Sequence, residues 1–372
     1  MHLAEIARLR MVPCAGLLLS LTRRCPLACA HCSTESSPES EQGEAASFLS
    51  LVGSFALEDR PEVILMSGGE PLLRPRLVRE LATRAKEAGT RAYLLSGMFF
   101  ARGRGTIPRA IENVLPSLDH FAASLDVFHE RQVGRDAVFR AVHRIREIVP
   151  AVSFQITGEG DDDPYLEDVV EDVRREFDDR IPVLVTRLRR TGRARRIWPV
   201  RTAGPHLPAA APLADPCALA TWPLVGHDGT VYACSRESLV LTSRPSHLVL
   251  GHASRDTWSE VRRRALSRAV LTGVRTMGPV EVRRRFGAGE PAPGGRRDPC
   301  VTCAGLADDH RLAARAEDYF HSPNGTIVAA LAGGAAARRD PYAFPRRWGS
   351  PRYAELVGLG WDGPGRGAEC AG

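Results

Sequence analysis

Lysine is almost absent from this chain, because Lys86 is the single lysine among 50 basic residues and all the others are arginines. A net charge of +6 and a pI near 9.0 would suit an acidic partner. Aromatic residues, however, make up only 6% of the chain and do not form the mixed aromatic and basic surface on which single-stranded bases stack. The arginine excess, with abundant Ala, Gly and Pro, is typical of a GC-rich coding sequence. We therefore expect no nucleic-acid partner.

Long apolar runs are absent as well. No stretch approaches the length that crosses a bilayer, and residues 1–13 carry charges where a signal peptide would have an apolar core. We expect a cytoplasmic protein with no membrane partner, in which nine cysteines favour metal ligation over disulfides. At 372 residues and 44% hydrophobic, the chain is long enough for one large domain and a smaller one.

Three of the cysteines lie within eight residues. Cys25, Cys29 and Cys32 have the spacing C-x3-C-x2-C and follow a strand-like run, residues 16–22. Thiolates this close cannot all pair as disulfides, but they can bind one cluster of soft metal ions. Three ligands leave a four-iron cluster with one open iron, and an open metal position binds a small molecule. A closed zinc or disulfide site is the alternative.

The motif resembles the cluster loop of radical S-adenosylmethionine (SAM) enzymes. A second stretch, Ser67-Gly68-Gly69-Glu70-Pro71, follows an apolar run and resembles the family's second signature. The resemblance implies a [4Fe-4S] cluster whose open iron binds SAM, with Gly68, Gly69 and Glu70 holding the ammonium group of the cofactor. It also implies that His31 lies beside the adenine, although a solvated loop histidine is the alternative.

The order of strands and helices predicts the fold. Six strand-like runs end near residues 21, 66, 95, 125, 157 and 188, and helical patterns separate them. Right-handed crossovers on such a parallel sheet bend toward a barrel. Residues 1–200 are therefore predicted to form a partial (β/α)6 barrel, an α/β fold that matches the resembled family.

Polar residues lie where these strands stop, at the end of the sheet where barrels carry their chemistry. Ser96, Ser124, Asp126 and Gln155 are the candidates for contacts with the ribose and methionine carboxylate of SAM, and Thr157 lies in the same position. The alternative is that Ser and Asp cap the helices that follow.

A second group of cysteines follows a Pro- and Ala-rich linker, residues 198–216. Asp228-Gly229 joins two apolar runs, which predicts a hairpin, and a long helical stretch is expected over residues 259–284. This frame, with Cys217, Cys234, Cys300 and Cys303, resembles the twitch form of the SPASM domain, and the resemblance implies one auxiliary [4Fe-4S] cluster. A four-cysteine zinc site is the alternative. The predicted domain covers residues 201–315, and residues 316–372 form a C-terminal extension without a recognised motif.

The resemblance implies a radical SAM enzyme. Cleavage of SAM would give a 5′-deoxyadenosyl radical that removes a hydrogen atom from a peptide or a small molecule, with flavodoxin or ferredoxin as reductant. Peptide modification is the commoner use of the twitch architecture, but about 13 residues precede the first strand, too few for a leader-binding domain. Oxidation of a small molecule such as an aminocyclitol is the alternative, and a non-catalytic iron–sulfur electron carrier is a third.

A cluster of arginines follows the sixth predicted strand. These residues either bind a substrate carboxylate or phosphate or form a solvated face, and they lie at positions 187, 189, 190, 193, 195 and 196.

Overall fold

The computed structural model describes residues 1–103, 106–197, 215–288, 298–337 and 340–363. A single nine-stranded sheet runs through it in the order β6-β5-β4-β3-β2-β1-β7-β8-β9. The strands are β1 (Gly16–Ser20), β2 (Val63–Ser67), β3 (Arg91–Ser96), β4 (His120–Ser124), β5 (Val152–Gly158), β6 (Val183–Arg187), β7 (Leu224–Val225), β8 (Thr230–Tyr232) and β9 (Val249–His252).

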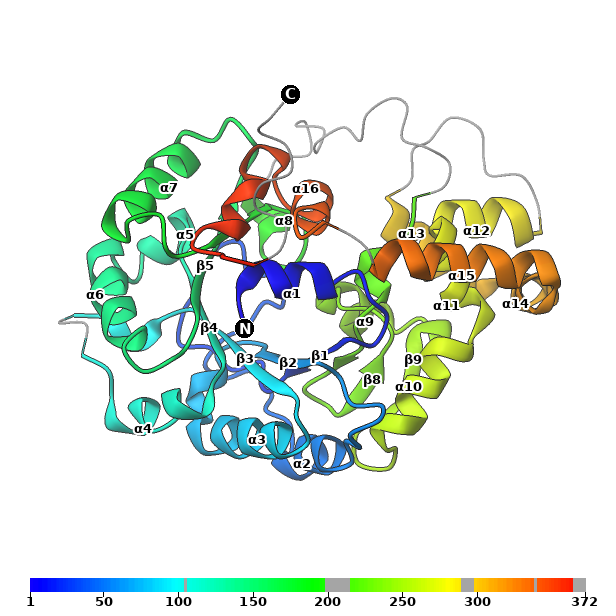
Figure 1. The fold of residues 1–372 in the computed structure, drawn as a ribbon, viewed down its shortest axis with the longest axis horizontal. Helices are drawn as coiled ribbons and strands as arrows, with labels where there is room; N and C mark the ends of the chain where they lie inside the picture. The colour runs from blue at the N-terminus through cyan, green and yellow to red at the C-terminus, as the bar shows by residue number, and fades with distance from the viewer. Residues whose placement is uncertain (104–105, 198–214, 289–297, 338–339, 364–372) are drawn as a thin grey trace.

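The first six strands are parallel neighbours and confirm the predicted α/β fold. The sheet curves without closing, as expected of a partial barrel, and helices cover its convex face (Figure 1). The helices of this half are α1 (Leu3–Leu9), α2 (Ala45–Gly53), α3 (Pro75–Glu87), α4 (Arg109–Glu112), α5 (Val127–Glu130), α6 (Arg135–Ile145), α7 (Pro164–Glu176) and α8 (Ala194–Ile197).

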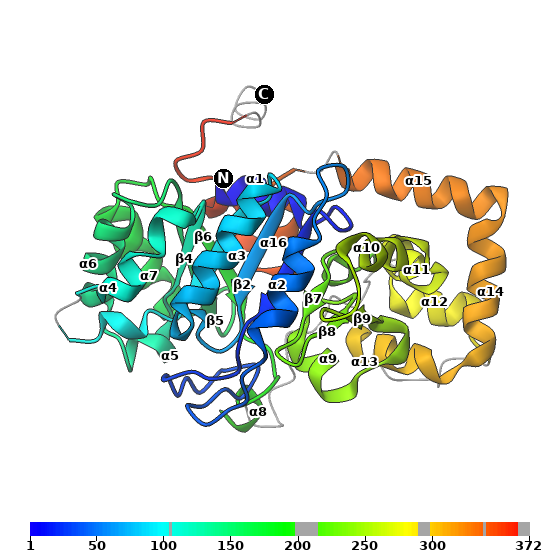
Figure 2. The same cartoon turned by 90° about the horizontal axis from the view of Figure 1, so that it is seen from below.

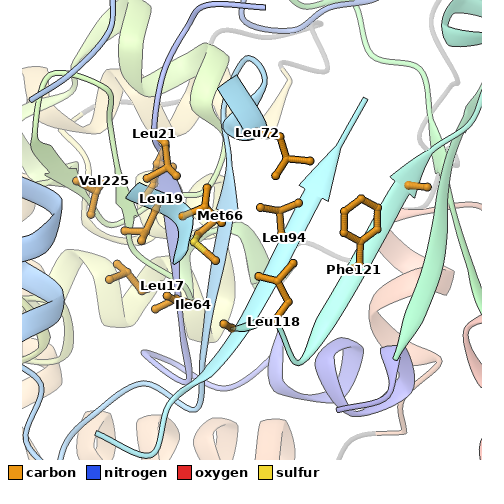
Figure 3. Close-up of a cluster of buried hydrophobic side chains, with 14 of the residues drawn as sticks. Leu17, Leu19, Leu21, Ile64, Met66, Leu72, Leu94, Leu118, Phe121 and Val225 are labelled. Atoms are coloured by element: carbon orange, nitrogen blue, oxygen red, sulfur yellow. The ribbon is translucent and has the colours of Figure 1, made fainter. Parts of the chain in front are cut away.

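Alternation along the strands separates two surfaces of the sheet. Leu17, Leu19, Ile64 and Met66 point to the convex side and are fully buried in the core under the helices (Figure 3). α3 has a matching apolar face at helical spacing, made of Leu77, Val78, Leu81, Ala82 and Ala85. The alternate strand residues face the concave side, where the site lies.

α1 covers part of the concave face and was not predicted from the sequence. Its Ile6 packs in a small core with Val63, Tyr93 and Trp222. His120 Nδ1 of β4 donates to the Met1 carbonyl at 2.9 Å, and its Nε2 lies 2.7 Å from Ser153 Oγ. α1 therefore fills the end of the barrel opposite the cysteine loop.

The predicted hairpin exists and belongs to the same sheet as the barrel. β7 and β8 pair antiparallel across Asp228-Gly229, while β7 also pairs parallel with β1 through Leu18–Leu224 and Leu19–Val225. The ladder therefore continues past the boundary expected near residue 200. Most of the expected linker, residues 198–216, lies outside the described residues.

The long helical stretch expected over 259–284 is three helices in the structure. Breaks fall at Arg268, which is extended, and at Gly278-Pro279. The helices of this half are α9 (Glu237–Ser243), α10 (Trp258–Ser267), α11 (Ala269–Met277), α12 (Pro279–Phe286), α13 (Pro299–Ala304), α14 (His310–His321) and α15 (Pro323–Ala337).

Part of the C-terminal extension returns to the barrel. α16 (Ala343–Trp348) and the 3-10 segment η7 (Pro351–Gly358) lie beside α1 and β6, as Figures 1 and 2 show from two directions. The Ser350 amide donates to the Val185 carbonyl at 3.0 Å. The extension thus covers the edge strand of the sheet.

Candidate active site

The cysteine loop opens directly from the end of β1. Cys25 and Cys29 are buried and Cys32 is half-buried, and all three line one cavity of about 490 Å³. The backbone fixes the loop, because the Cys25 amide donates to the Ser37 carbonyl at 3.1 Å and the Cys32 amide donates to the Cys29 carbonyl at 3.2 Å. Every cysteine in the described residues is free of a disulfide.

The three sulfur atoms have different surroundings. Burial raises the pKa of the Cys25 thiol to about 12. Burial opposes ionisation of Cys32 too, but Thr34 and the Ser36 amide, 3.4 Å from its Sγ, bring its pKa below the usual value. Gln132 Nε2 donates to Cys29 Sγ at 3.4 Å. A bound cation would favour the thiolate form of Cys25 against the effect of burial.

The Gly68-Gly69 turn lies against the start of the cysteine loop. Gly69 donates its amide to the Thr22 carbonyl at 2.6 Å, and a Cβ on Gly69 would lie 2.3 Å from the Arg24 carbonyl oxygen. Gly68 has φ +120°, a conformation that favours glycine. Both glycines line the cavity, so the second motif brings bare backbone next to the three thiols.

Glu70 is oriented differently from what the motif implies. Its side chain is fully buried and does not line the cavity. The carboxylate accepts hydrogen bonds from the Leu72 amide at 3.0 Å, the Gly97 amide at 2.9 Å and Ser96 Oγ at 3.1 Å. Burial raises its pKa to about 7. In this structure Glu70 and Ser96 tie the glycine turn to the end of β3.

His31, Asp126 and His129 form a compact cluster beside the cysteines. Asp126 Oδ2 lies 2.9 Å from His129 Nδ1 and 3.4 Å from His31 Nε2. Burial alone would raise the pKa of Asp126, but the adjacent histidines, His129 above all, hold it below its usual range. Asp126 also caps α5 and does not line the cavity. Asp126 therefore makes the contacts of a helix cap, which was the alternative to a contact with SAM.

His31 faces the cavity and stacks on Phe128, with ring centroids 4.6 Å apart. Its Nδ1 is buried and has no hydrogen-bond partner in the described structure. A flat ring with an unused polar atom lies therefore beside the cysteine loop, in keeping with the expected adenine contact.

The other polar residues at the strand ends fall into two groups, those that line the cavity and those that are buried behind it. Ser124 and Gln155 line the cavity, as does Thr157, whose Oγ1 lies 3.1 Å from Thr186 Oγ1. Ser96 and Asp126 are buried behind the wall. The sequence thus predicted which strand ends form the site, while the direction of each side chain depends on its neighbours in the sheet.

The second cysteine set gathers behind another wall of the cavity. Cys217 precedes the short segment Ala218–Ala220, Cys234 follows β8, and Cys300 and Cys303 lie on α13. Burial is the main cause that raises the pKa of each of the four. Other members of the set raise it further at Cys217, Cys234 and Cys303, whereas Arg236 opposes the rise at Cys300. His247 Nε2 approaches Cys303 Sγ at 3.7 Å.

Sulfur spacing bears on what these sets can bind. Among the described residues, ligand atoms of three or more Cys, His, Asp or Glu come within 4.8 Å of one another only at His31, Asp126 and His129. Thiolates on one tetrahedral zinc would lie about 3.8 Å apart, given Zn–S bonds of about 2.3 Å. In neither cysteine set do three sulfur atoms come within 4.8 Å of one another in this structure.

Several residues of the cavity were missed by the sequence analysis. Arg10 comes from α1, Phe344 and Trp348 come from α16, and Glu237 follows Cys234 by three positions. A capping pair, His2 and Glu5, marks the start of α1 and was the one local signal for that helix. No local pattern marks α16 as part of a site.

Comparison with known proteins finds a family match in the first part of the chain. Residues 19–173 match the family model described as the Radical SAM superfamily. The matched segment includes the cysteine loop, the glycine turn and strands β2 to β5. No helix of the described chain is long and apolar enough to cross a membrane.

Two curated relatives match parts of the chain. The Fe-coproporphyrin III synthase of Methanosarcina barkeri is 33% identical over 138 residues, which are 34% of this chain and 33% of that protein. The PqqA peptide cyclase of Ruegeria pomeroyi is 34% identical over 115 residues, or 30% and 28% of the two chains. The chain spans about a third of the length of each relative.

Solved structures give weaker likenesses. Streptococcus suis SuiB bound to S-adenosylmethionine is 13% identical, with 64% of each chain covered and a TM-score of 0.43. BtrN in complex with AdoMet and 2-DOIA is 14% identical, with 71% of this chain and 87% of that chain covered and a TM-score of 0.44. Similarity at this level does not bear on the substrate.

Proposed function

We propose that the protein is a radical SAM enzyme that binds a [4Fe-4S] cluster on Cys25, Cys29 and Cys32. One observation carries the proposal. Within the segment that matches the family model, the three thiols and the Gly68-Gly69 backbone open onto the same cavity at the carboxyl ends of the strands. An electron carrier would need the thiols but has no use for a glycine turn beside an open iron.

The residues around the cysteines fit the cofactor. When bound, the cluster and SAM supply reductive cleavage to methionine and a 5′-deoxyadenosyl radical, which takes a hydrogen atom from the substrate. In this proposal the glycine turn faces the ammonium group, and the stacked His31 and Phe128 border the adenine. Ser124 and Gln155 offer polar contacts to the ribose and carboxylate.

A second cluster on Cys217, Cys234, Cys300 and Cys303 is proposed as an electron acceptor. Other thiols of the set act on the pKa of Cys217, Cys234 and Cys303, which supports their proximity. Four protein ligands would leave no iron open, so this cluster would transfer electrons and bind no SAM. Removal of a hydrogen atom, an electron and a proton would make the net reaction an oxidation.

The substrate is proposed to be a peptide, with a small molecule as the second candidate. A segment 34% identical to a PqqA peptide cyclase favours the first, and the similar match to an Fe-coproporphyrin III synthase favours the second. A flavodoxin or ferredoxin in the cytoplasm would supply electrons.

The decisive experiment is cleavage of SAM by the anaerobically reconstituted, dithionite-reduced chain, with 5′-deoxyadenosine and methionine quantified. Joint replacement of Cys25, Cys29 and Cys32 by Ala should abolish cleavage. The double variant Cys300→Ala, Cys303→Ala should retain uncoupled cleavage but lose oxidised product. Cys14→Ala is the matched control, because Cys14 is a buried free cysteine outside both sets.

Two outcomes would count against the proposal. Failure of the reconstituted parent chain to cleave SAM would remove the enzyme assignment. A soluble Cys300 and Cys303 variant that forms product at the parent rate would remove the role of electron acceptor.

A further inference from the structure

Two arginines face the cavity without an acidic partner. Arg10 on α1 and Arg189, just beyond β6, both line it, and in the described part of the chain neither forms an ion pair with a carboxylate. The other cavity arginines are engaged. Arg187 pairs with Asp161, Arg236 lies 3.7 Å from Asp298, and Arg193 donates to the Cys29 carbonyl at 2.9 Å. Arg10 and Arg189 are therefore the cations with unused binding capacity.

One face of α16 contacts both side chains. The Arg10 guanidinium lies 5.2 Å from the Phe344 ring centroid, and the Arg189 guanidinium lies 5.8 Å from the Trp348 ring centroid. Phe344 and Trp348 are four positions apart, so their rings share one side of the helix. Both cations therefore contact aromatic rings on the same face of α16.

Both guanidinium groups would gain from a bound anion. Burial lowers the pKa of Arg10 to about 10, so the group still carries its charge at neutral pH. Arg189 is exposed as a residue, and partial desolvation of its guanidinium, followed by the charge of Arg236, lowers its pKa. Arg10 donates through Nη2 to Ser235 Oγ at 2.9 Å, but its Nη1 is buried and has no partner in the described structure. A buried donor without an acceptor is costly.

The position of the pair argues against a role in binding SAM. Ser235, the partner of Arg10, directly follows Cys234, and the charges of Cys234 and Cys217 act on Arg10. Cys300 and Cys217 likewise act on Arg189. The two arginines therefore lie on the side of the cavity next to the second cysteine set.

We propose that Arg10 and Arg189 bind an oxyanion of the substrate, a carboxylate or a phosphate, while Phe344 and Trp348 contact the apolar atoms beside it. Guanidinium groups match such anions in geometry as well as charge. This inference rests on the proposed function, because it places the anionic end of the substrate near the auxiliary cluster.

The test measures anion binding to the reconstituted, oxidised chain saturated with SAM, so that the cofactor occupies its own site and is not consumed. Succinate and inorganic phosphate are titrated calorimetrically at fixed ionic strength, with neutral succinamide as the uncharged probe. The parent should bind one or both anions saturably in the millimolar range and succinamide not at all. A preference for succinate or for phosphate identifies the oxyanion.

Arg10→Gln and Arg189→Gln should each weaken anion binding about tenfold or more. Arg190→Gln is the matched control, since Arg190 is exposed like its neighbour Arg189 but does not line the cavity. Arg10→Lys guards against misfolding of the Gln variant and should also bind more weakly, because it keeps the charge but loses the planar fork.

Three results would overturn the inference: no saturable binding by the parent, equal binding by the variants at 10 and 189, or weaker SAM affinity in those variants without anion. The last result would assign the arginines to the carboxylate of SAM. Cleavage of SAM by the reduced parent is measured separately. Its absence would remove the proposed function and leave the anion measurement intact.

Discussion

At the scale of single residues, Glu70 shows how a motif and a structure can assign different work to one side chain. The motif implies contact with SAM, whereas the carboxylate in the structure accepts from Leu72, Ser96 and Gly97. It thereby fixes the glycine turn from behind. The cofactor contact of Glu70 itself stays a prediction.

Glu70→Ala should lower the free energy of unfolding by about 2–4 kcal/mol, because it leaves several buried donors without an acceptor. Glu70→Gln should cost less, since the amide oxygen still accepts. Urea unfolding of both variants checks this, with the exposed Glu39→Ala as control. If Glu70→Ala has parental stability yet binds SAM more weakly, the carboxylate contacts the cofactor directly.

His120 should give the protein a sensitivity to acid. Burial lowers its pKa to about 3, from 6.5, while its ring bonds to Met1 and Ser153. The unfolded chain therefore takes up a proton first, and stability that is full above pH 6.5 is lost as the pH falls toward 3. The slope from this one group is about 1.4 kcal/mol per pH unit.

Unfolding free energies of the parent and of His120→Asn, measured between pH 7 and 5, test this expectation. The parent should lose stability more steeply than the variant. Equal slopes would show that the ring is protonated in the folded state.

Residues that line the cavity could be predicted where the signal lies in one short stretch of sequence. Cys25, Cys29, Cys32 and the two glycines could be predicted because the cysteine spacing and the Gly-Gly pair can be recognised within a few consecutive residues. Arg10 and Trp348 could not, since they reach the cavity only after α16 packs against α1 and β6.

At the scale of elements, the six parallel strands were predictable from alternating apolar runs, and the hairpin from Asp228-Gly229. Of the two breaks in the predicted long helix, the one between α11 and α12 was signalled by Gly278-Pro279, because Gly-Pro often ends a helix. The pairing of β7 with β1 was not predictable, because two-residue strand contacts carry no pattern and the register depends on the assembled sheet.

The contact between the C-terminal extension and β6 is testable at Gly349. A Cβ there would lie 2.5 Å from the Val185 carbonyl oxygen and 2.8 Å from that of Pro345. Gly349→Ala should therefore push the extension off the edge strand and cost about 1–3 kcal/mol in thermal or urea unfolding.

Gly333→Ala on α15 is the matched control, because a Cβ there meets nothing within 4 Å. It should be neutral or stabilising by up to about 1 kcal/mol. Equal effects of the two substitutions would show that the extension does not press on β6.

At the scale of the whole molecule, one cysteine set lines the cavity and the other lies behind one of its walls. If each set holds a four-iron cluster, anaerobic analysis should find about eight iron and eight sulfide per chain. The Cys300 and Cys303 double variant should fall to about four and unfold more readily, because the four thiols come from separate elements. About four iron with one zinc in the parent would contradict the second cluster.

The parallel pairing of β1 with β7 has a consequence for protein engineering. β1, which leads into the first cysteine loop, pairs with β7, the first strand of the hairpin that ends just before Cys234. A chimera that exchanges the C-terminal half for that of another enzyme must therefore rebuild this seam, Leu18–Leu224 and Leu19–Val225, as well as the linker. A chimera joined only at the linker would leave β1 without the backbone and side-chain contacts of its native partner β7.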